Sequence, residues 1–133
     1  MYTITGIGSS NTVEYTECEE DASKVTLPDT VSIDGNTYRV TSVGDKAFYN
    51  NKNLKAVAIG SNVSRIDSKA FYGCTNLKQI VVYSKNISSI GSKAFKRVPK
   101  SVKVLLTKTK YKSYRKMLMK VGISVKAKFK KIK

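Results

Sequence analysis

The stretch VGDKAF, residues 43–48, decides the fold because close copies of it follow twice along the chain. The second copy is IDSKAF at residues 66–71, and the third is IGSKAF at residues 90–95. The phenylalanines that end these copies are separated by 23 and 24 residues. A unit of this length cannot cover its own apolar face, so neighbouring units stack and bury a continuous core. The chain is therefore predicted to be a repeat protein.

Other apolar positions recur in the same phase. They are Leu54, Val57 and Ile59 in the first unit, Leu77, Ile80 and Val82 in the second, and Val104 and Leu106 in the third. A period in the low twenties with the pattern Leu-x-x-(Val/Ile)-x-(Val/Ile) is typical of a leucine-rich-repeat solenoid, in which one strand per repeat lines a horseshoe. Stacking would place Phe48, Phe71 and Phe95 in one column, where burial of each ring contributes about 1.5–3 kcal/mol.

The same units carry a family pattern. Residues 77–82 have the order Leu-Lys-x-Ile-x-Val, residues 88–95 have Ser-x-Ile-Gly-x-x-Ala-Phe, and Cys74 stands three residues after Phe71. This pattern resembles the BspA-type leucine-rich repeat of bacterial surface proteins, in particular their C-terminal repeat region, and the resemblance covers residues 24–133. It implies an extracellular module that serves adhesion and ligand binding.

We predict one strand-dominated α/β domain over residues 1–133, a short right-handed leucine-rich-repeat solenoid. Residues 1–23 would form an N-terminal β cap, because the weak alternation in residues 2–15 indicates two strands joined by a turn. Residues 24–106 would hold the repeats, and the first strand of the first repeat would cover residues 24–28. Residues 107–133 would form a basic C-terminal cap of helix and strand.

The turns carry signals of their own. Asp34-Gly35 predicts an inserted β-hairpin in the first unit, since this pair accepts the positive φ that tight hairpin turns require. Gly44, Asp67 and Gly91 suit the corner before each Lys-Ala-Phe turn. The side-chain oxygens expected to cap these turns are those of Asp45, Ser68 and Ser92.

The C-terminal region predicts a helix followed by a strand. In residues 109–121 the apolar side chains share one helical face, and Gly122 is the expected stop. Such a basic amphipathic helix either covers the last repeat or lies on an anionic membrane. Residues 123–129 alternate as a final strand, and residues 130–133 are expected to fray. Ser101 replaces the usual leucine, which indicates that the array ends there.

The composition argues against an enzyme. The chain has no histidine, which excludes His-based acid–base, triad and zinc chemistry. Phosphate loops and dinucleotide fingerprints are missing from the sequence, and no cofactor is expected. Cys74 is expected to be a small buried residue; a disulfide to Cys18 is the alternative. The acidic stretch around Cys18 lacks the spacing of a calcium loop, so no metal site is predicted.

Charge is divided unequally along the chain. Residues 1–67 hold six basic and nine acidic residues, net −3, whereas residues 68–133 hold 19 basic and no acidic residues. Such asymmetry favours a polyanionic partner; a solvated basic surface is the alternative. No module specific for nucleic acid is recognisable. The candidate polyanion-binding residues are Lys93, Lys96, Arg97, Lys100, Lys110, Lys112, Arg115 and Lys116.

The strand phase predicts a second binding surface. If Val57 and Ile59 point inward, the alternate residues point to the concave face. They form three rows: Lys24, Ala56, Gln79 and Lys103; Thr26, Ala58, Val81 and Leu105; Pro28, Gly60, Tyr83 and Thr107. The candidate ligand-binding residues are Gln79, Val81, Tyr83, Lys103 and Leu105. Among them Val81, Tyr83 and Leu105 are expected to form an exposed apolar patch, with ordinary strand composition as the alternative.

We therefore expect a non-catalytic binding or adhesion module of a bacterial surface protein, contacting a host or bacterial protein or an anionic polysaccharide such as teichoic acid. The alternative is a structural terminal cap that holds a larger surface protein to the anionic cell wall. No apolar run is long enough for a transmembrane segment, and residues 1–6 lack a secretory signal. The extracellular location implied by the family then requires a longer parent protein; a small cytosolic protein is the alternative. A monomer or weak homodimer is expected, because short solenoids expose edge strands.

Overall fold

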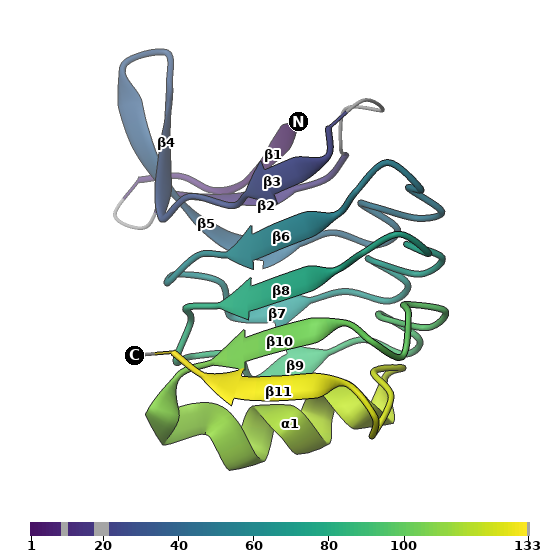
Figure 1. The fold of residues 1–133 in the computed structure, drawn as a ribbon. Helices are drawn as coiled ribbons and strands as arrows, with labels where there is room; N and C mark the ends of the chain where they lie inside the picture. Colours follow the sequence, from purple (N-terminus) through teal and green to yellow (C-terminus); the bar gives the residue numbers. More distant parts are fainter. Residues whose placement is uncertain (9–10, 18–21, 133) are drawn as a thin grey trace.

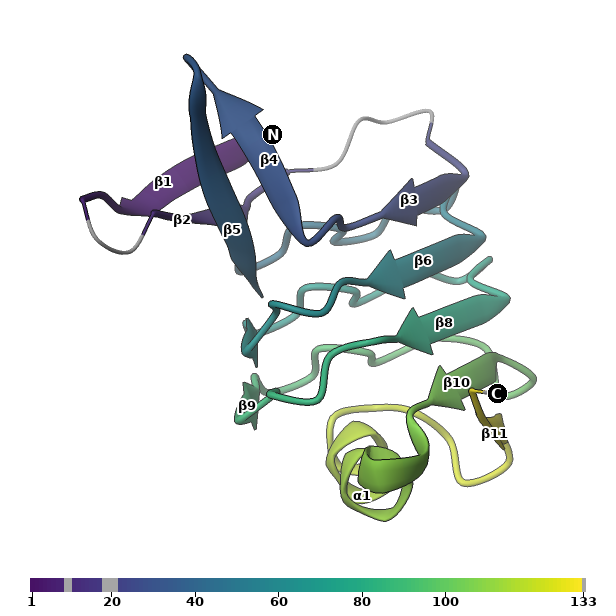
Figure 2. The same ribbon diagram turned by 90° about the vertical axis from the view of Figure 1, so that its left-hand side faces the viewer.

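A computed structural model describes residues 1–8, 11–17 and 22–132. Two sheets run along the stack of repeats and enclose the core between them (Figures 1 and 2). The parallel sheet contains β3 (Lys24–Thr26), β6 (Ala56–Ile59), β8 (Gln79–Val82), β10 (Lys103–Leu106) and β11 (Lys128–Lys131). The other sheet contains β1 (Tyr2–Gly6), β2 (Thr12–Tyr15), β5 (Asn36–Val43), β7 (Arg65–Ile66) and β9 (Ser89–Ile90), with β4 (Thr30–Ile33) paired to β5.

The repeat phase predicted from the sequence matches the strand register. In the parallel sheet Val57 pairs with Ile80, and Ile80 pairs with Val104. These three side chains are buried, as are Leu54 and Leu77. In the third unit Val102 is buried while the predicted leucine position, Ser101, is exposed. A neighbouring valine thus fills the space that leucine fills in the other units.

The predicted phenylalanine column is present. The ring centroids of Phe48 and Phe71 lie 4.7 Å apart, and those of Phe71 and Phe95 lie 4.8 Å apart, with interplanar angles of 8° and 7°. Tyr15 extends the column, since its ring stacks on Phe48 at 5.1 Å. The N-terminal hairpin therefore contributes a ring to the core of the repeats.

The Lys-Ala-Phe turns differ from the prediction in how they are held. Among the described residues, no hydrogen bond joins the side chain of Asp45, Ser68 or Ser92 to its turn, so the predicted caps are wrong. The positive φ falls on the lysine of each turn and not on the corner glycine. The turn backbone is instead satisfied by the next repeat, as when the Phe48 N–H donates to the Ala70 carbonyl at 2.6 Å.

The N-terminal segments form the two predicted hairpins. Strand β1 pairs antiparallel with β2, and β2 pairs parallel with β5, which joins the first hairpin to the repeats. Strands β4 and β5 form the inserted hairpin, which projects away from the stack in Figure 2. Both residues of its turn have positive φ, 50° at Asp34 and 81° at Gly35.

The predicted helical face is also confirmed. A short 3₁₀ turn, Lys108–Lys110, leads into α1 (Tyr111–Lys120), which lies beneath the last strands in Figure 1. Tyr114 and Leu118 are buried, and the rest of the predicted face packs against the core. After Gly122, the Ile123 N–H donates to the Leu118 carbonyl at 3.0 Å, which closes the helix end.

The final strand begins later than predicted. Strand β11 starts at Lys128 and pairs parallel with β10, so the expectation that the last lysines fray is wrong for Lys130 and Lys131. The preceding segment is needed to return the chain from the helix to the sheet edge, and Ile123 is buried in that turn. Lysines are common on edge strands because their charge discourages further pairing.

Cys74 is buried, and its thiol donates to the Phe48 carbonyl at 3.1 Å. Cys18 and most of the acidic stretch around it lie outside the described residues. Within the described ranges, no three His, Cys, Asp or Glu side chains gather as metal ligands would. No helix in that part of the chain has the length and apolar character needed to cross a bilayer.

Candidate functional site

The outer face of the parallel sheet, which we term the strand surface, has the predicted rows. Gln79 pairs in register with Ala56 on one side and with Lys103 on the other. Val81 pairs in the same way with Ala58 and Leu105. Strand β11 adds Lys128 to the first row, beside Lys103, and Lys130 to the second, beside Leu105; the sequence did not predict this because its strand was placed too early.

The expected apolar patch on the strand surface is smaller than predicted. Val81 is only 8% exposed, since it lies on the central strand with a paired strand on either side. Tyr83, just beyond the end of β8, is 48% exposed, and Leu105 is half-buried. Gln79 and Lys103 are also half-buried. Tyr83 is thus the aromatic side chain that this surface offers to a partner.

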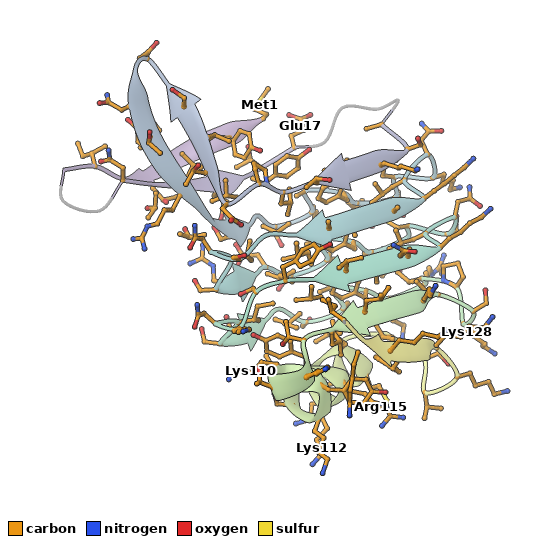
Figure 3. All side chains as sticks on the ribbon, turned by 60° about the vertical axis from the view of Figure 1, so that its left-hand side comes forward. Met1, Glu17, Lys110, Lys112, Arg115 and Lys128 are labelled. Atoms are coloured by element: carbon orange, nitrogen blue, oxygen red, sulfur yellow. The ribbon has the colours of Figure 1, made fainter. Side chains whose placement is uncertain are left out.

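The eight candidate polyanion-binding residues fall into two groups. Lys93, Lys96, Arg97 and Lys100 lie in the turn and loop between β9 and β10. Lys110, Lys112, Arg115 and Lys116 lie on the 3₁₀ turn and α1. Figure 3 shows Lys110, Lys112 and Arg115 around the helix, at the opposite end of the stack from Met1 and Glu17. The Arg115 guanidinium lies over the Phe129 ring at 5.1 Å, which fixes one cation of this group.

Few of these charges are neutralised within the molecule. In residues 1–8, 11–17 and 22–132, the ion pairs are those of Arg65, with Glu14 at 3.0 Å and Asp67 at 2.8 Å. The hydrogen bond to Asp67 is the main cause of the raised pKa of Arg65. No described lysine or arginine beyond Asp67 has an ion pair. The C-terminal half of the described chain therefore presents uncompensated positive charge.

A third surface is formed by the turns themselves. We refer to residues 45–53, 68–76 and 92–100 as the turn face. Tyr49 and Tyr72 stack on it at 5.2 Å, with Lys46 over the first ring and Arg97 over the second. The sequence predicted polyanion binding for the third turn of this surface but not for its first two turns. The recurring lysine of the Lys-Ala-Phe motif was the signal that could have identified them.

The structural comparisons agree with this architecture. A leucine rich cell surface protein from Faecalibacterium prausnitzii A2-165 has a TM-score of 0.61 and 28% identity, over 80% of this chain and 32% of that one. Leucine-rich repeat proteins from Bacteroides capillosus and Bacteroides ovatus have TM-scores of 0.65 and 0.51 and identities of 17% and 24%. The alignments cover 96% and 82% of this chain, and 98% and 36% of those chains.

The chain thus spans about a third of the length of the F. prausnitzii protein and nearly all of the B. capillosus protein. The two Bacteroides similarities establish the fold alone. No curated protein matches the sequence. The model of the BspA type leucine rich repeat region matches residues 15–120, in six copies, which is most of the chain. This protein is therefore a member of the BspA-type leucine-rich repeat family, a family of bacterial surface repeat proteins.

Proposed function

We propose that this chain is a non-catalytic extracellular binding module of a bacterial surface protein, and that it holds a polyanionic ligand through its basic C-terminal half. The observation that carries the proposal is the complete absence of acidic residues after Asp67, beside 19 basic ones. Anionic wall polymers and acidic polysaccharides are the ligands that such a surface attracts.

The arrangement of the charges supports a ligand larger than a single ion. The basic residues cover the turn between β9 and β10, the helix α1 and the edge strand β11, and these elements lie together at one end of the stack in Figure 1. A small anion would contact only one of these elements. A polymer can contact several, and each contact adds to the salt dependence of binding.

A structural role for the same region is the second candidate. We propose that the β1–β2 hairpin and the α1–β11 segment cap the two ends of a right-handed solenoid, since both ends of a repeat stack need a cover. The observation that favours it is the contact of Gly122 with the backbone of Phe95 and Lys96, which seats the end of α1 on the last turn. In this alternative the basic end holds the parent protein to the anionic wall without recognising a further partner.

A protein ligand on the strand surface is the third candidate, favoured by the exposure of Tyr83. One experiment separates the first two candidates, which both contact a polyanion, from the third: retention of the purified chain on immobilised heparin and on immobilised teichoic acid across a salt gradient, beside a panel of host matrix proteins. Polyanion binding predicts late elution that moves to lower salt in a Lys112→Gln, Arg115→Gln and Lys116→Gln variant. Early elution of the unmodified chain from both columns would refute it.

A different result would establish the strand surface as the site. In that case the chain would bind one matrix protein saturably, and the binding would be lost in Tyr83→Ala but unchanged in the variant with the three α1 substitutions. Late elution without any matrix-protein binding would favour polyanion or wall attachment. Because an exposed tyrosine and three charged side chains on the helix surface are changed, circular dichroism should show the same fold for both variants.

A further inference from the structure

The turn face carries a column of lysines. Lys46, Lys69 and Lys93 occupy the same place in three successive turns, with φ values of 58°, 56° and 59°. Backbone hydrogen bonds hold the turns in register: the Lys46 N–H donates to the Ser68 carbonyl and the Lys69 N–H to the Ser92 carbonyl, each at 3.1 Å. Matching backbones point the three Cα–Cβ bonds in one direction, about 4.8 Å apart as in paired strands.

This column opposes the stability of the fold. Positive φ is uncommon for residues other than glycine, and asparagine adopts it more readily than lysine. Neighbouring ammonium groups repel each other, and within the described residues none of the three lysines has a carboxylate partner. Strained backbone positions persist where they serve function. A turn that needed only this geometry would be satisfied by glycine or asparagine, which favours a role for the lysine charge itself.

A hollow on the turn face offers further donors. Asn50, Lys52, Gly73, Thr75 and Arg97 line it, and no acidic residue is among them. The guanidinium of arginine presents a planar fork of N–H groups that matches phosphate or sulfate oxygens. Gly73 leaves room for the Asn50 side chain, since a Cβ there would meet the Asn50 Oδ1 atom.

The tyrosine stack holds two of these cations in place. The Lys46 ammonium lies 5.4 Å from the centre of the Tyr49 ring, and the Arg97 guanidinium 5.8 Å from that of Tyr72. Both faces of the stack are thereby covered, so it is not a platform for sugar rings. Its effect is to restrict the charged side chains before a ligand arrives, which reduces the entropy lost on binding.

We propose that the turn face binds a linear wall polymer or glycan, not a nucleic acid, whose phosphate or sulfate groups repeat regularly along the stacking axis across all three turns. One oxyanion occupies the hollow between Lys52 and Arg97, and others follow the column of Lys46, Lys69 and Lys93. This inference rests on the proposed function and specifies its ligand class and path. It also extends the site to the first two turns, and the first of them, residues 45–53, lies outside the basic half of the chain.

The test is a triple variant, Lys46→Asn, Lys69→Asn and Lys93→Asn. Asparagine tolerates positive φ, so the variant should fold and be at least as stable as the unmodified chain. A matched control, Lys24→Gln, Arg39→Gln and Lys55→Gln, removes the same charge from exposed positions outside both the turn face and the basic C-terminal half. Affinity for poly(glycerol phosphate) and for heparin is measured at several salt concentrations by fluorescence anisotropy.

For three lost contacts to a linear polyanion, the slope of log affinity against log salt should become shallower by about 2, since each contact contributes about 0.7. The control should change the slope by less than half as much. Arg97→Gln should weaken binding at least fivefold at 0.15 M salt, because the hollow loses its bidentate donor. Binding of only one polymer would identify the source as wall phosphate or sulfated glycan, and either supports the inference.

Three results would overturn it. If the control or the Lys112→Gln, Arg115→Gln and Lys116→Gln variant weakens binding as much as the turn triple, the polyanion function stands and the turn face is wrong. If the unmodified chain binds neither polymer, both proposals fail. Tighter binding to single-stranded DNA than to both polymers would overturn the assigned ligand class.

Discussion

Replacement of Phe71 by alanine tests whether the aromatic column stabilises the fold. Phe71 is fully buried between Phe48 at 4.7 Å and Phe95 at 4.8 Å. Truncation of a buried phenylalanine typically costs about 3–5 kcal/mol through lost burial and the cavity left behind. Since small domains unfold with about 5–15 kcal/mol, this single change should remove about a fifth or more of the stability. Phe71→Leu keeps much of the volume and should cost about 1.5 kcal/mol.

The assay is urea unfolding followed by circular dichroism. The urea concentration at the unfolding midpoint should fall, while the slope of the free energy of unfolding against urea concentration stays constant. Tyr49→Ala is the matched control, because Tyr49 also stacks on an aromatic neighbour, Tyr72 at 5.2 Å, but is 41% exposed. Its loss should cost about 1 kcal/mol. If Phe71→Ala costs no more than Tyr49→Ala, the column does not contribute as argued, and the core depends on the strands alone.

Three further predictions concern the ends of the stack and its surface. Gly122→Ala should lower the free energy of unfolding by at least about 2 kcal/mol, because φ is 127° and a Cβ would meet the backbone of Phe95 and Lys96. Gly35→Ala is the control and should lower it by about 1 kcal/mol, since φ is 81° and the space around Gly35 is open. Equal losses in urea unfolding would contradict the close approach of Gly122 to the last turn. Arg65→Ala should lose less than about 1 kcal/mol, since the Arg65 side chain is 49% exposed beside Glu14 and Asp67; a loss that persists undiminished in 1 M salt would show that the ion pairs matter more than this. Burial raises the pKa of Tyr114 above its ordinary value of 10.0, so the stability that Tyr114 contributes is complete below that pH and declines as pH rises toward the raised value. The melting temperature of the unmodified chain should therefore fall more steeply with pH above 10 than that of Tyr114→Phe. Equal slopes for the two chains would refute this.

The fold was predictable from sequence to the extent that it depends on repeated local patterns. The three phenylalanines and the paired aliphatic positions were placed correctly because they repeat in phase. The Asp34-Gly35 hairpin was placed correctly because this pair has a strong local preference for a tight turn. The predicted side-chain caps at Asp45 and its counterparts were wrong. The sequence shows a turn with a nearby oxygen, but not that the next repeat already satisfies the turn backbone.

The candidate sites were less predictable because exposure depends on neighbours that are distant in sequence. The alternation of the strand predicts that Val81 lies on its outer face, yet the flanking strands leave the side chain only 8% exposed. The eight basic candidates form one list in sequence but two groups in space, on a turn and on a helix. The Tyr49–Tyr72 stack and its two cations had no sequence signal beyond two tyrosines that follow phenylalanine.

By itself, the sequence determined that this protein is a stack of short repeats, that its C-terminal half is strongly basic and that histidine chemistry is absent, because period and composition do not depend on folding. The tertiary structure alone decided which side chains stand side by side. Stacking at the spacing of paired strands brings residues 23 or 24 positions apart into contact. It thereby turns a recurring lysine into a column of charge, and it places Tyr15 of the first hairpin on the rings of the repeats.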